Sequence, residues 1–296
     1  MRAGVILNPR AGRAGSTAGL AGARADFARA VLARHGASAD VRISEGAGHA
    51  AALARACLAA GADVVIAWGG DGTINEVAGP LIGGRVPLAI VPGGSGDGLA
   101  RSLGLPRRAE LALRLAVTGP RGPMDVGWIG PRHFLNLAGI GFDAAVADRF
   151  NRRGRRGLRG YVTGALRTVW GHRPGACTLA LDDRSLEGPR FVVVFANGSQ
   201  YGSGLVIAPD ASPWDGWLNL VVVDDGSPLR QIWRARRLFI RPLDPAEGVL
   251  RAAIRTARIS GSRLLGHVDG ESFTASGTLD VRLDAGALLL AGLAPR

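Results

Sequence analysis

Short apolar runs alternate with longer segments of helical periodicity over the first 118 residues of the chain. Four runs, each bounded by turn residues, have the length and composition of buried strands: residues 5–7, 39–43, 64–68 and 86–91. Between the first two, residues 18–34 carry apolar side chains at helical spacing, and Gly36 follows as a stop signal. This alternation predicts an α/β N-terminal domain, with a parallel sheet and helices on both of its faces.

The pattern changes after a glycine- and proline-rich linker at residues 119–123. Two short apolar segments flank Gly130 and Pro131 and predict a hairpin, and a helical stretch is expected from Gly139 onward. Further segments are typical of strands: residues 177–181, 190–196, 218–223, 257–260, 263–268, 279–283 and 288–290. Many strands and few helices predict a mainly antiparallel β-sandwich as the second domain.

Composition narrows the chemistry that these domains can perform. Hydrophobic residues make up 47% of the 296 positions, and the net charge of +12 is carried without a single lysine. A P-loop lysine is therefore excluded, so a phosphate site must use arginine, backbone N–H groups, hydroxyls or a metal ion. The positive balance favours an anionic partner, such as a nucleotide, a membrane surface or a nucleic acid.

The cysteines and the hydropathy of the chain indicate in which cellular compartment the protein is expected. Cys57 and Cys177 lie in apolar surroundings, and two thiols make neither a disulfide framework nor a zinc site. The chain enters a strand pattern at Gly4, which argues against a signal peptide, and it has no apolar run of about 20 residues. We expect a cytoplasmic protein that is at most peripheral to the inner face of the membrane.

Three glycine-bearing loops follow predicted strands. The central one reads Gly69-Gly70-Asp71-Gly72-Thr73-Ile74-Asn75-Glu76-Val77, and the others are Asn8-Pro9-Arg10-Ala11-Gly12 and residues 92–101. Glycines let backbone N–H groups face a phosphate closely at the start of a helix. We expect Asp71 or Thr73 to cap the helix that follows. A carboxylate in such a loop would hold Mg²⁺ or take a proton from an acceptor hydroxyl.

These strings resemble the nucleotide-binding loops of the diacylglycerol kinase and sphingosine kinase catalytic-domain family. Gly-Gly-Asp-Gly-Thr is shared with NAD kinases, but the Asn-Glu-Val continuation and the later string Gly-x-Gly-Phe-Asp-Ala are similar to the lipid kinases. The resemblance implies a nucleotide-binding domain at residues 1–123, joined by residues 284–296, and a β-rich lipid-substrate and metal domain at 124–283. It implies ATP contacts from Asn8, Pro9, Arg10, Ala11, Gly12, Ser44, Gly69, Gly70, Asp71, Gly72, Thr73, Ile74, Asn75 and Ser95.

The third loop departs from the family pattern. Ser95 replaces a threonine in a form closer to sphingosine kinases, while Asp97 and Gly98 replace the usual Asn-Asp of bacterial diacylglycerol kinases. Asp97 places an acid where an amide is usual. We therefore expect its side chain to cap the next helix and not to contact the nucleotide.

Two acidic segments complete the resemblance. The string from Pro209 to Leu218 matches the family's Pro-x-Ala-x-x-x-Asp-Gly-x-Leu, which implies Mg²⁺ bound by Asp215 and the backbone oxygens of Ser212 and Trp217. A turn without metal is the alternative. The string Asp-Gly-Glu271 implies Glu271 as general base, although Asp-Gly alone is an ordinary hairpin turn. Asp71 is the other candidate base, and the sequence does not decide between the two.

Two arginine runs suit an anionic membrane surface that presents a lipid substrate. The runs are Arg152, Arg153, Arg155, Arg156 and Arg159, and Arg234, Arg236, Arg237 and Arg241. A solvated helix face is the alternative for each run. No stacking aromatics or recognised motif accompany the arginines, so we expect no nucleic-acid partner. A homodimer stays open.

The sequence thus indicates an ATP-dependent lipid kinase that uses Mg²⁺ and transfers the γ-phosphate to a lipid hydroxyl. Diacylglycerol, a sphingoid base or a related lipid all fit as acceptor. The alternatives are an NAD kinase-like enzyme and a non-catalytic nucleotide or lipid sensor, and the sensor rests on the departures at Asp97 and Gly98.

Overall fold

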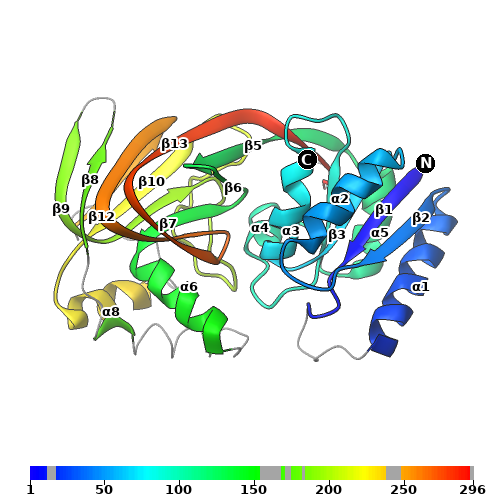
Figure 1. The fold of residues 1–296 in the computed structure, drawn as a ribbon, viewed down its shortest axis with the longest axis horizontal. Coiled ribbons are helices and arrows are strands. Elements are labelled where there is room, and N and C mark those ends of the chain that lie inside the picture. Colours follow the sequence, from blue (N-terminus) through cyan, green and yellow to red (C-terminus); the bar gives the residue numbers. More distant parts are fainter. Residues whose placement is uncertain (12–17, 154–167, 171–174, 182–183, 238–247, 294–296) are drawn as a thin grey trace. The chain divides into compact units, whose positions relative to one another are not determined.

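The computed structural model describes residues 1–11, 18–153, 168–170, 175–181, 184–237 and 248–293 (Figure 1). These residues divide into two units, Met1–Met124 with Gly286–Arg296, and Asp125–Ala285.

The first unit is built on parallel strands. Its strands are β1 (Arg2–Leu7), β2 (Ser38–Ile43), β3 (Val64–Gly69) and β4 (Leu88–Pro92), in the lateral order β2-β1-β3-β4. β1 pairs in parallel with β2 and β3 (Figure 1). β3 also pairs in parallel with β4. The last residues of β13 (Glu271–Ala291) lie parallel to β4, where Leu290 pairs with Leu88.

Helices cover both faces of the sheet in the first unit. The helices are α1 (Ala18–Arg34), α2 (His49–Ala59), α3 (Asp71–Ala78), α4 (Gly98–Ser102) and α5 (Ala109–Thr118). Val5 packs in one cluster with Val31 of α1 and Leu113 of α5. The neighbouring Gly4 points the other way, where a Cβ would come within 2.6 Å of the Cys57 sulfur in α2. Helices therefore pack against both faces of β1, because its buried side chains alternate.

The junction after α5 differs from the predicted linker. β5 (Arg121–Ile129) begins inside residues 119–123, so most of that segment is strand. The hairpin around Gly130 and Pro131 is confirmed, since Ile129 pairs with Arg132 of β6 (Arg132–Phe134). The helix expected from Gly139 begins only at Phe142, because β7 (Leu137–Gly141) pairs with strands on both sides.

The second unit is dominated by antiparallel pairing. Its remaining elements are α6 (Phe142–Arg153), β8 (Ala176–Ala180), β9 (Ser185–Ala196), β10 (Leu218–Asp224), α8 (Pro228–Arg237), β11 (Val249–Ile254) and β12 (Thr256–Val268). The lateral order is β11-β10-β9-β7-β12-β13, and β8 pairs with both β9 and β12. The predicted strands at 257–260 and 263–268 are one strand, β12, whose pairing register shifts between Gly261 and Leu264.

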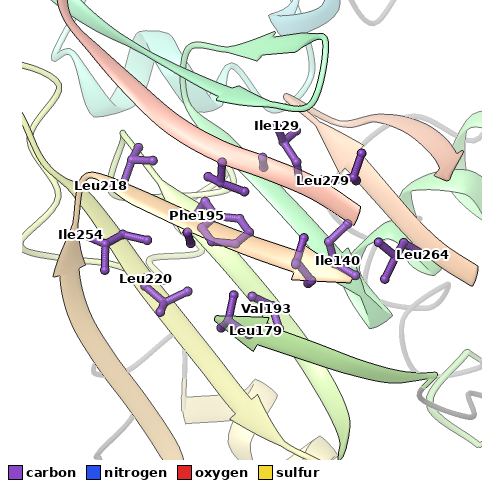
Figure 2. Packing of buried hydrophobic residues seen from close by; sticks show 14 of the residues in the cluster. Ile129, Ile140, Leu179, Val193, Phe195, Leu218, Leu220, Ile254, Leu264 and Leu279 are labelled. Carbon is purple, nitrogen blue, oxygen red and sulfur yellow. The ribbon is translucent and has the colours of Figure 1, made fainter. Parts of the chain in front are cut away.

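The core of the second unit is mainly aliphatic and includes the buried rings of Phe134 and Phe195. Figure 2 shows Phe195 of β9 with Leu218, Leu220, Val193 and Ile140 around it, and all of them are buried. Because these side chains come from β7, β9 and β10, the cluster ties three neighbouring strands together.

The turn between β4 and α4 contains a buried acid. Asp97 has φ +47° and is 4% exposed, and its Oδ1 accepts a 2.7 Å hydrogen bond from the backbone N–H of Gly94. Its side chain therefore turns backward, and the expectation that it caps α4 is wrong. Burial raises the pKa of Asp97, and the Gly94 N–H together with Arg107 and Arg101 opposes that rise.

We predict that Asp97→Asn stabilises the protein at neutral pH. An amide oxygen can still accept from Gly94, asparagine tolerates a positive φ, and the buried charge is gone. Because the folded-state pKa is raised, the folded protein binds a proton more tightly than the unfolded chain. The wild type therefore loses stability as pH rises from about 4 through the raised pKa.

Thermal melts of both proteins between pH 3.5 and pH 8 measure this effect. The variant should melt a few degrees higher at pH 7, a typical shift for one side chain in a domain of this size, and equally at the lowest pH. Asp97→Ala, which loses the acceptor, is the destabilised control. A variant that melts below wild type at pH 7 would mean that attraction to Arg101 and Arg107 outweighs burial.

Candidate functional site

Strand order in the first unit creates a natural ligand position. From β1 the chain moves to β2 on one side, and from β2 it returns to β3 on the other. In parallel α/β sheets, ligands bind outside the carboxyl ends of the strands where the order reverses in this way. The loops after β1, β3 and β4 carry the predicted nucleotide residues, and β1 and β3 flank the reversal.

Asn8 joins the first two loops. Its Nδ2 donates to Thr73 Oγ1 at 2.8 Å, its Oδ1 accepts the Arg10 N–H at 2.9 Å, and its N–H donates to the Trp68 carbonyl at 2.9 Å. Asn8 therefore positions backbone, and Arg10 lies exposed beside it. Pro9 is part of the same turn, and the carbonyl of buried Ala11 accepts from Arg24 at 3.1 Å. Gly12 lies outside the described residues.

The second and third loops approach each other backbone to backbone. A Cβ on Gly69 would lie 2.6 Å from Thr73 Cβ, and one on Gly94 would lie 2.9 Å from the Gly70 Cα. The Gly93 N–H donates to the Gly69 carbonyl at 2.9 Å. The close approach of the two loops requires glycine at these positions, so their sequence is explained by packing alone. Ser95 is exposed in the same compact loop.

Asp71 caps a neighbouring helix. Its Oδ2 accepts the Gly98 N–H at 2.9 Å and its Oδ1 accepts the Leu99 N–H at 3.1 Å, at the start of α4. Its own helix, α3, begins after Gly70 and has no side-chain cap. The prediction that Asp71 or Thr73 caps α3 is therefore wrong, because the Asp71 carboxylate serves the helix after the next strand and the Thr73 hydroxyl is engaged by Asn8.

Glu76 caps the start of α2, a role that the sequence analysis did not predict. Its Oε1 accepts the Gly48 N–H at 2.8 Å, and its Oε2 accepts the Ala50 N–H at 3.2 Å. The available signals were an acid in the string that resembles the lipid kinases and a helix that starts after a glycine. His49 Nδ1 accepts the Glu45 N–H at 3.1 Å, which is a local capping contact.

The remaining predicted nucleotide residues differ in what they can present. Ser44 is buried, and its N–H donates to the Leu7 carbonyl at 2.9 Å. Ile74 has its side chain in the core, so only its backbone is available. Gly72 and Asn75 lie partly exposed in the first turns of α3.

In the second unit, Glu271 follows a rigid hairpin turn. β12 and β13 are joined by Asp269 and Gly270, with φ of +47° and +90°, as a type I′ turn requires. The Asp269 carboxylate accepts three backbone N–H groups, from Leu135 at 2.8 Å, Asn136 at 2.9 Å and Leu137 at 3.0 Å. Glu271 is exposed at the first position of β13.

A buried pair of titratable side chains lies behind this turn. His267 Nε2 is 2.9 Å from Asp143 Oδ2, and both side chains are almost fully buried. The Tyr201 hydroxyl donates to the same Asp143 oxygen at 3.1 Å. The string that contains Asp143 was noted in the sequence, but periodicity gave no reason to assign it a role.

The predicted metal turn is held by an acid that the sequence did not single out. Asp125 is buried, its Oδ2 accepts the Gly216 N–H at 2.8 Å, and its own N–H donates to the Pro213 carbonyl at 2.9 Å. Asp215 is exposed and its Oδ1 accepts the Trp217 N–H at 2.9 Å. Ser212 lies in the same turn, three residues before Asp215. Within the described residues, no group of three or more His, Cys, Asp or Glu side chains could hold a metal ion.

The arginine runs are only partly visible. Arg152 and Arg153 end α6, while Arg155, Arg156, Arg159 and Arg241 lie outside the described residues. Arg234 is 2% exposed and donates from Nη1 to the Asp224 carbonyl at 2.9 Å, so its place in a membrane-facing run is wrong. The Arg234 side chain lies on the buried face of α8. Leu229 and Trp233 of the same helix are exposed.

None of the helices that the structure describes is both long enough and apolar enough to span a bilayer.

Comparison with known proteins identifies both units. Residues 2–129 match the diacylglycerol kinase catalytic domain, and residues 136–291 match the YegS C-terminal NAD kinase beta sandwich-like domain. A probable lipid kinase YegS-like protein of Chromohalobacter salexigens is 36% identical over 65% of this chain and 64% of its own length. A diacylglycerol kinase of Mycobacterium tuberculosis is 34% identical over 67% of this chain and 70% of its own.

A solved structure shares the whole fold. A putative diacylglycerol kinase from Bacillus anthracis superposes with a TM-score of 0.79 at 23% identity, covering 98% of this chain and 94% of that one. The two matched domains span most of the residues, and the second alone covers more than half of them. The chain therefore belongs to the diacylglycerol kinase catalytic-domain family of lipid kinases, as a member whose second domain is of the YegS C-terminal type.

Proposed function

We propose that the protein transfers the γ-phosphate of ATP to a hydroxyl group of a lipid. One observation carries the proposal: in a chain of this family, the three glycine loops are fixed to one another at the strand-order reversal. Asn8 bonds to Thr73, Gly70 lies against Gly94, and Asp71 holds the start of α4. Phosphoryl transfer depends mainly on positioning and on charge stabilisation, and such a fixed backbone supports both.

The first unit supplies the nucleotide contacts in this proposal. Backbone N–H groups of the Gly69–Thr73 segment and the exposed Ser95 hydroxyl would bind phosphate oxygens. The exposed guanidinium of Arg10 lies in the loop after β1 and takes the part that lysine has in other kinases.

The geometry favours Glu271 over Asp71 as the general base. Both carboxylate oxygens of Asp71 already accept backbone N–H groups, which stabilises its charged form and makes it a poor proton acceptor. Glu271 is exposed at the end of a turn that Asp269 fixes in place. We therefore assign proton abstraction from the acceptor hydroxyl to Glu271, and positioning of the third loop to Asp71.

Two alternatives to a lipid kinase are an NAD kinase-like enzyme and a non-catalytic sensor. An NAD kinase-like reaction is compatible with the fold of the second domain, which is described as NAD kinase-like, but the catalytic-domain match favours a lipid kinase. The sensor hypothesis rests on Asp97 and Gly98. Asp97 turns away to Gly94, and the Gly98 N–H serves Asp71, so both departures are accommodated within an intact loop.

A magnesium ion at the Asp215 turn fits the donor chemistry. A carboxylate with two backbone carbonyls, from Ser212 and Trp217, is the hard oxygen set that Mg²⁺ takes, with water completing its shell. One carboxylate oxygen accepts the Trp217 N–H, and the other is the candidate ligand. When bound, the ion would add rigidity to this turn; Mg²⁺ on the nucleotide would neutralise phosphate charge.

The acceptor is expected at a membrane surface. In α8, Leu229 is 72% exposed and Trp233 is 48% exposed, with Arg230 also exposed nearby. Apolar side chains next to arginine suit the interface of an anionic bilayer. This proposal keeps the mixed arginine and apolar surface expected from the sequence but without Arg234, which is buried.

We predict ATP-dependent phosphorylation of at least one lipid in a panel of diacylglycerol, sphingoid base, ceramide and phosphatidylglycerol. Each lipid is presented in anionic vesicles and in a short-chain soluble form, with NAD as a further acceptor. Glu271→Gln should lower turnover roughly 10²- to 10⁴-fold and leave ATP affinity almost unchanged, because glutamine cannot take the proton. Phosphorylation of NAD alone, or ATP binding without any turnover, would replace the proposed function by one of the alternatives.

Asp71→Asn should lower kcat/KM by about 10²-fold or more, because an amide nitrogen would face one of the N–H donors of α4. Melting temperature should fall as well, by the amount expected for a lost helix cap. Glu76→Gln is the matched control, since it weakens the α2 cap in the same way. Equal activity losses in the two variants would make Asp71 a stability residue only.

Asp215→Ala should shift the Mg²⁺ dependence of activity to higher concentration and reduce the stabilisation that Mg²⁺ gives in thermal melts. The protein without nucleotide is used for the melts, so that the ion carried by ATP does not contribute. Asp210, also exposed and close in sequence, provides the control variant Asp210→Ala. Unchanged Mg²⁺ titrations would leave Asp215 as a turn residue.

A further inference from the structure

The buried His267 and Asp143 have no part in the function proposed above. Their side chains are 4% and 6% exposed, with Nε2 and Oδ2 2.9 Å apart. Burying two titratable groups is costly unless their hydrogen bonds are satisfied. The neighbouring strand makes room for them, because a Cβ on Gly139 would lie 1.9 Å from Asp143 Oδ2 and 2.7 Å from His267 Nε2.

The hydrogen-bond network assigns the histidine tautomer. The Gly270 N–H donates to His267 Nδ1 at 3.4 Å, so Nδ1 is the acceptor and Nε2 carries the proton that faces Asp143. Asp143 is itself fixed, since its Oδ1 accepts the Ala144 N–H at 2.8 Å and its Oδ2 accepts from the Tyr201 hydroxyl at 3.1 Å. The imidazole is therefore held in one orientation, with its lone pair toward the turn.

The contact at Gly270 connects this network to Glu271. Gly270 immediately precedes Glu271 in the two-residue turn, and Asp269 anchors the turn on the side of Leu135 and Leu137. His267 adds the second anchor, from within β12, where it pairs with Gly139 of β7 and Ser272 of β13. The backbone on both sides of Gly270 is thus constrained before the Glu271 side chain begins.

We infer that His267, oriented by Asp143, is a positioning residue that fixes the direction of Glu271 through the Gly270 N–H. This inference rests on the proposed role of Glu271 as general base. A proton acceptor works only within hydrogen-bond reach of the hydroxyl, and a small misplacement costs much of its rate effect. The pair acts as an oriented histidine does behind a metal or a nucleophile, one step removed from the reacting atoms.

Two variants separate the two ends of the imidazole. His267→Asn places an amide oxygen near the Nδ1 position and keeps an acceptor for Gly270, but it loses the contact with Asp143. His267→Gln extends an amide nitrogen toward Asp143 and loses the acceptor for Gly270. We expect kcat to fall about 10- to 100-fold in the glutamine variant and only a few-fold in the asparagine variant, with KM for ATP unchanged in both.

A double-mutant cycle with Glu271→Gln tests whether His267 acts through Glu271. Once the base is absent, His267→Gln should reduce kcat no further, because there is nothing left to position. If the two losses multiply, or if the two His267 variants lose activity in parallel with melting temperature, His267 is a core residue and the inference fails.

Hydrogen exchange of the Gly270 and Glu271 amides gives a readout without turnover. The Gly270 amide should exchange roughly tenfold faster in His267→Gln than in wild type, as expected for one lost hydrogen bond, and should stay protected in His267→Asn. Equal protection in all three proteins overturns the inference even if the enzyme is active. The expected exchange pattern in a protein that phosphorylates no lipid would instead locate the failure in the proposed function.

Discussion

Two carboxylates of one short helix hold the loops of the first unit in place. Asp71 and Glu76 lie on α3, and each accepts two backbone N–H groups at the start of another helix, α4 and α2 respectively. The first N–H groups of a helix have no partner inside it, so a carboxylate there satisfies them and interacts favourably with the helix dipole. The loops after β2, β3 and β4 are thereby fixed relative to α3, and Asn8 adds the loop after β1. The segment from Asp71 to Glu76 therefore has a structural role, whether or not it binds a ligand.

The elements that the sequence predicted well are those with a strong local signal. Helix α1 has the predicted bounds, Ala18–Arg34, because its periodicity and the glycine stop agree, and Gly36 indeed has φ +75°. The hairpin at Gly130 was equally readable from turn chemistry. β11 was missed, and the last three residues of β7 were assigned to a helix, because both strands depend on pairing with strands distant in sequence, which periodicity does not report.

The resemblance to a known family supplied the candidate site residues, but it did not predict their hydrogen-bond partners. The motif strings located the loops, yet Asp71 and Glu76 bind backbone groups of other segments, and Asp97 binds a backbone group earlier in its own loop. No local pattern distinguishes an acid that caps its own helix from one that caps a neighbour. The buried Asp143 and His267 illustrate the same limit, since they are 124 residues apart and meet only when α6 packs against β12.

The pairing of β13 with β4 has a consequence for synthesis of the chain. β4 ends at Pro92, whereas its partner residues Leu290 and Ala291 emerge from the ribosome about two hundred residues later. Until then one side of β4 carries unpaired backbone groups, a template for pairing with other chains. Folding of the first unit thus includes a contact of very long sequence separation, which slows its completion and prolongs the exposure of this edge. The nascent chain is most vulnerable to aggregation after its three glycine loops have been synthesised and before β13 pairs with β4.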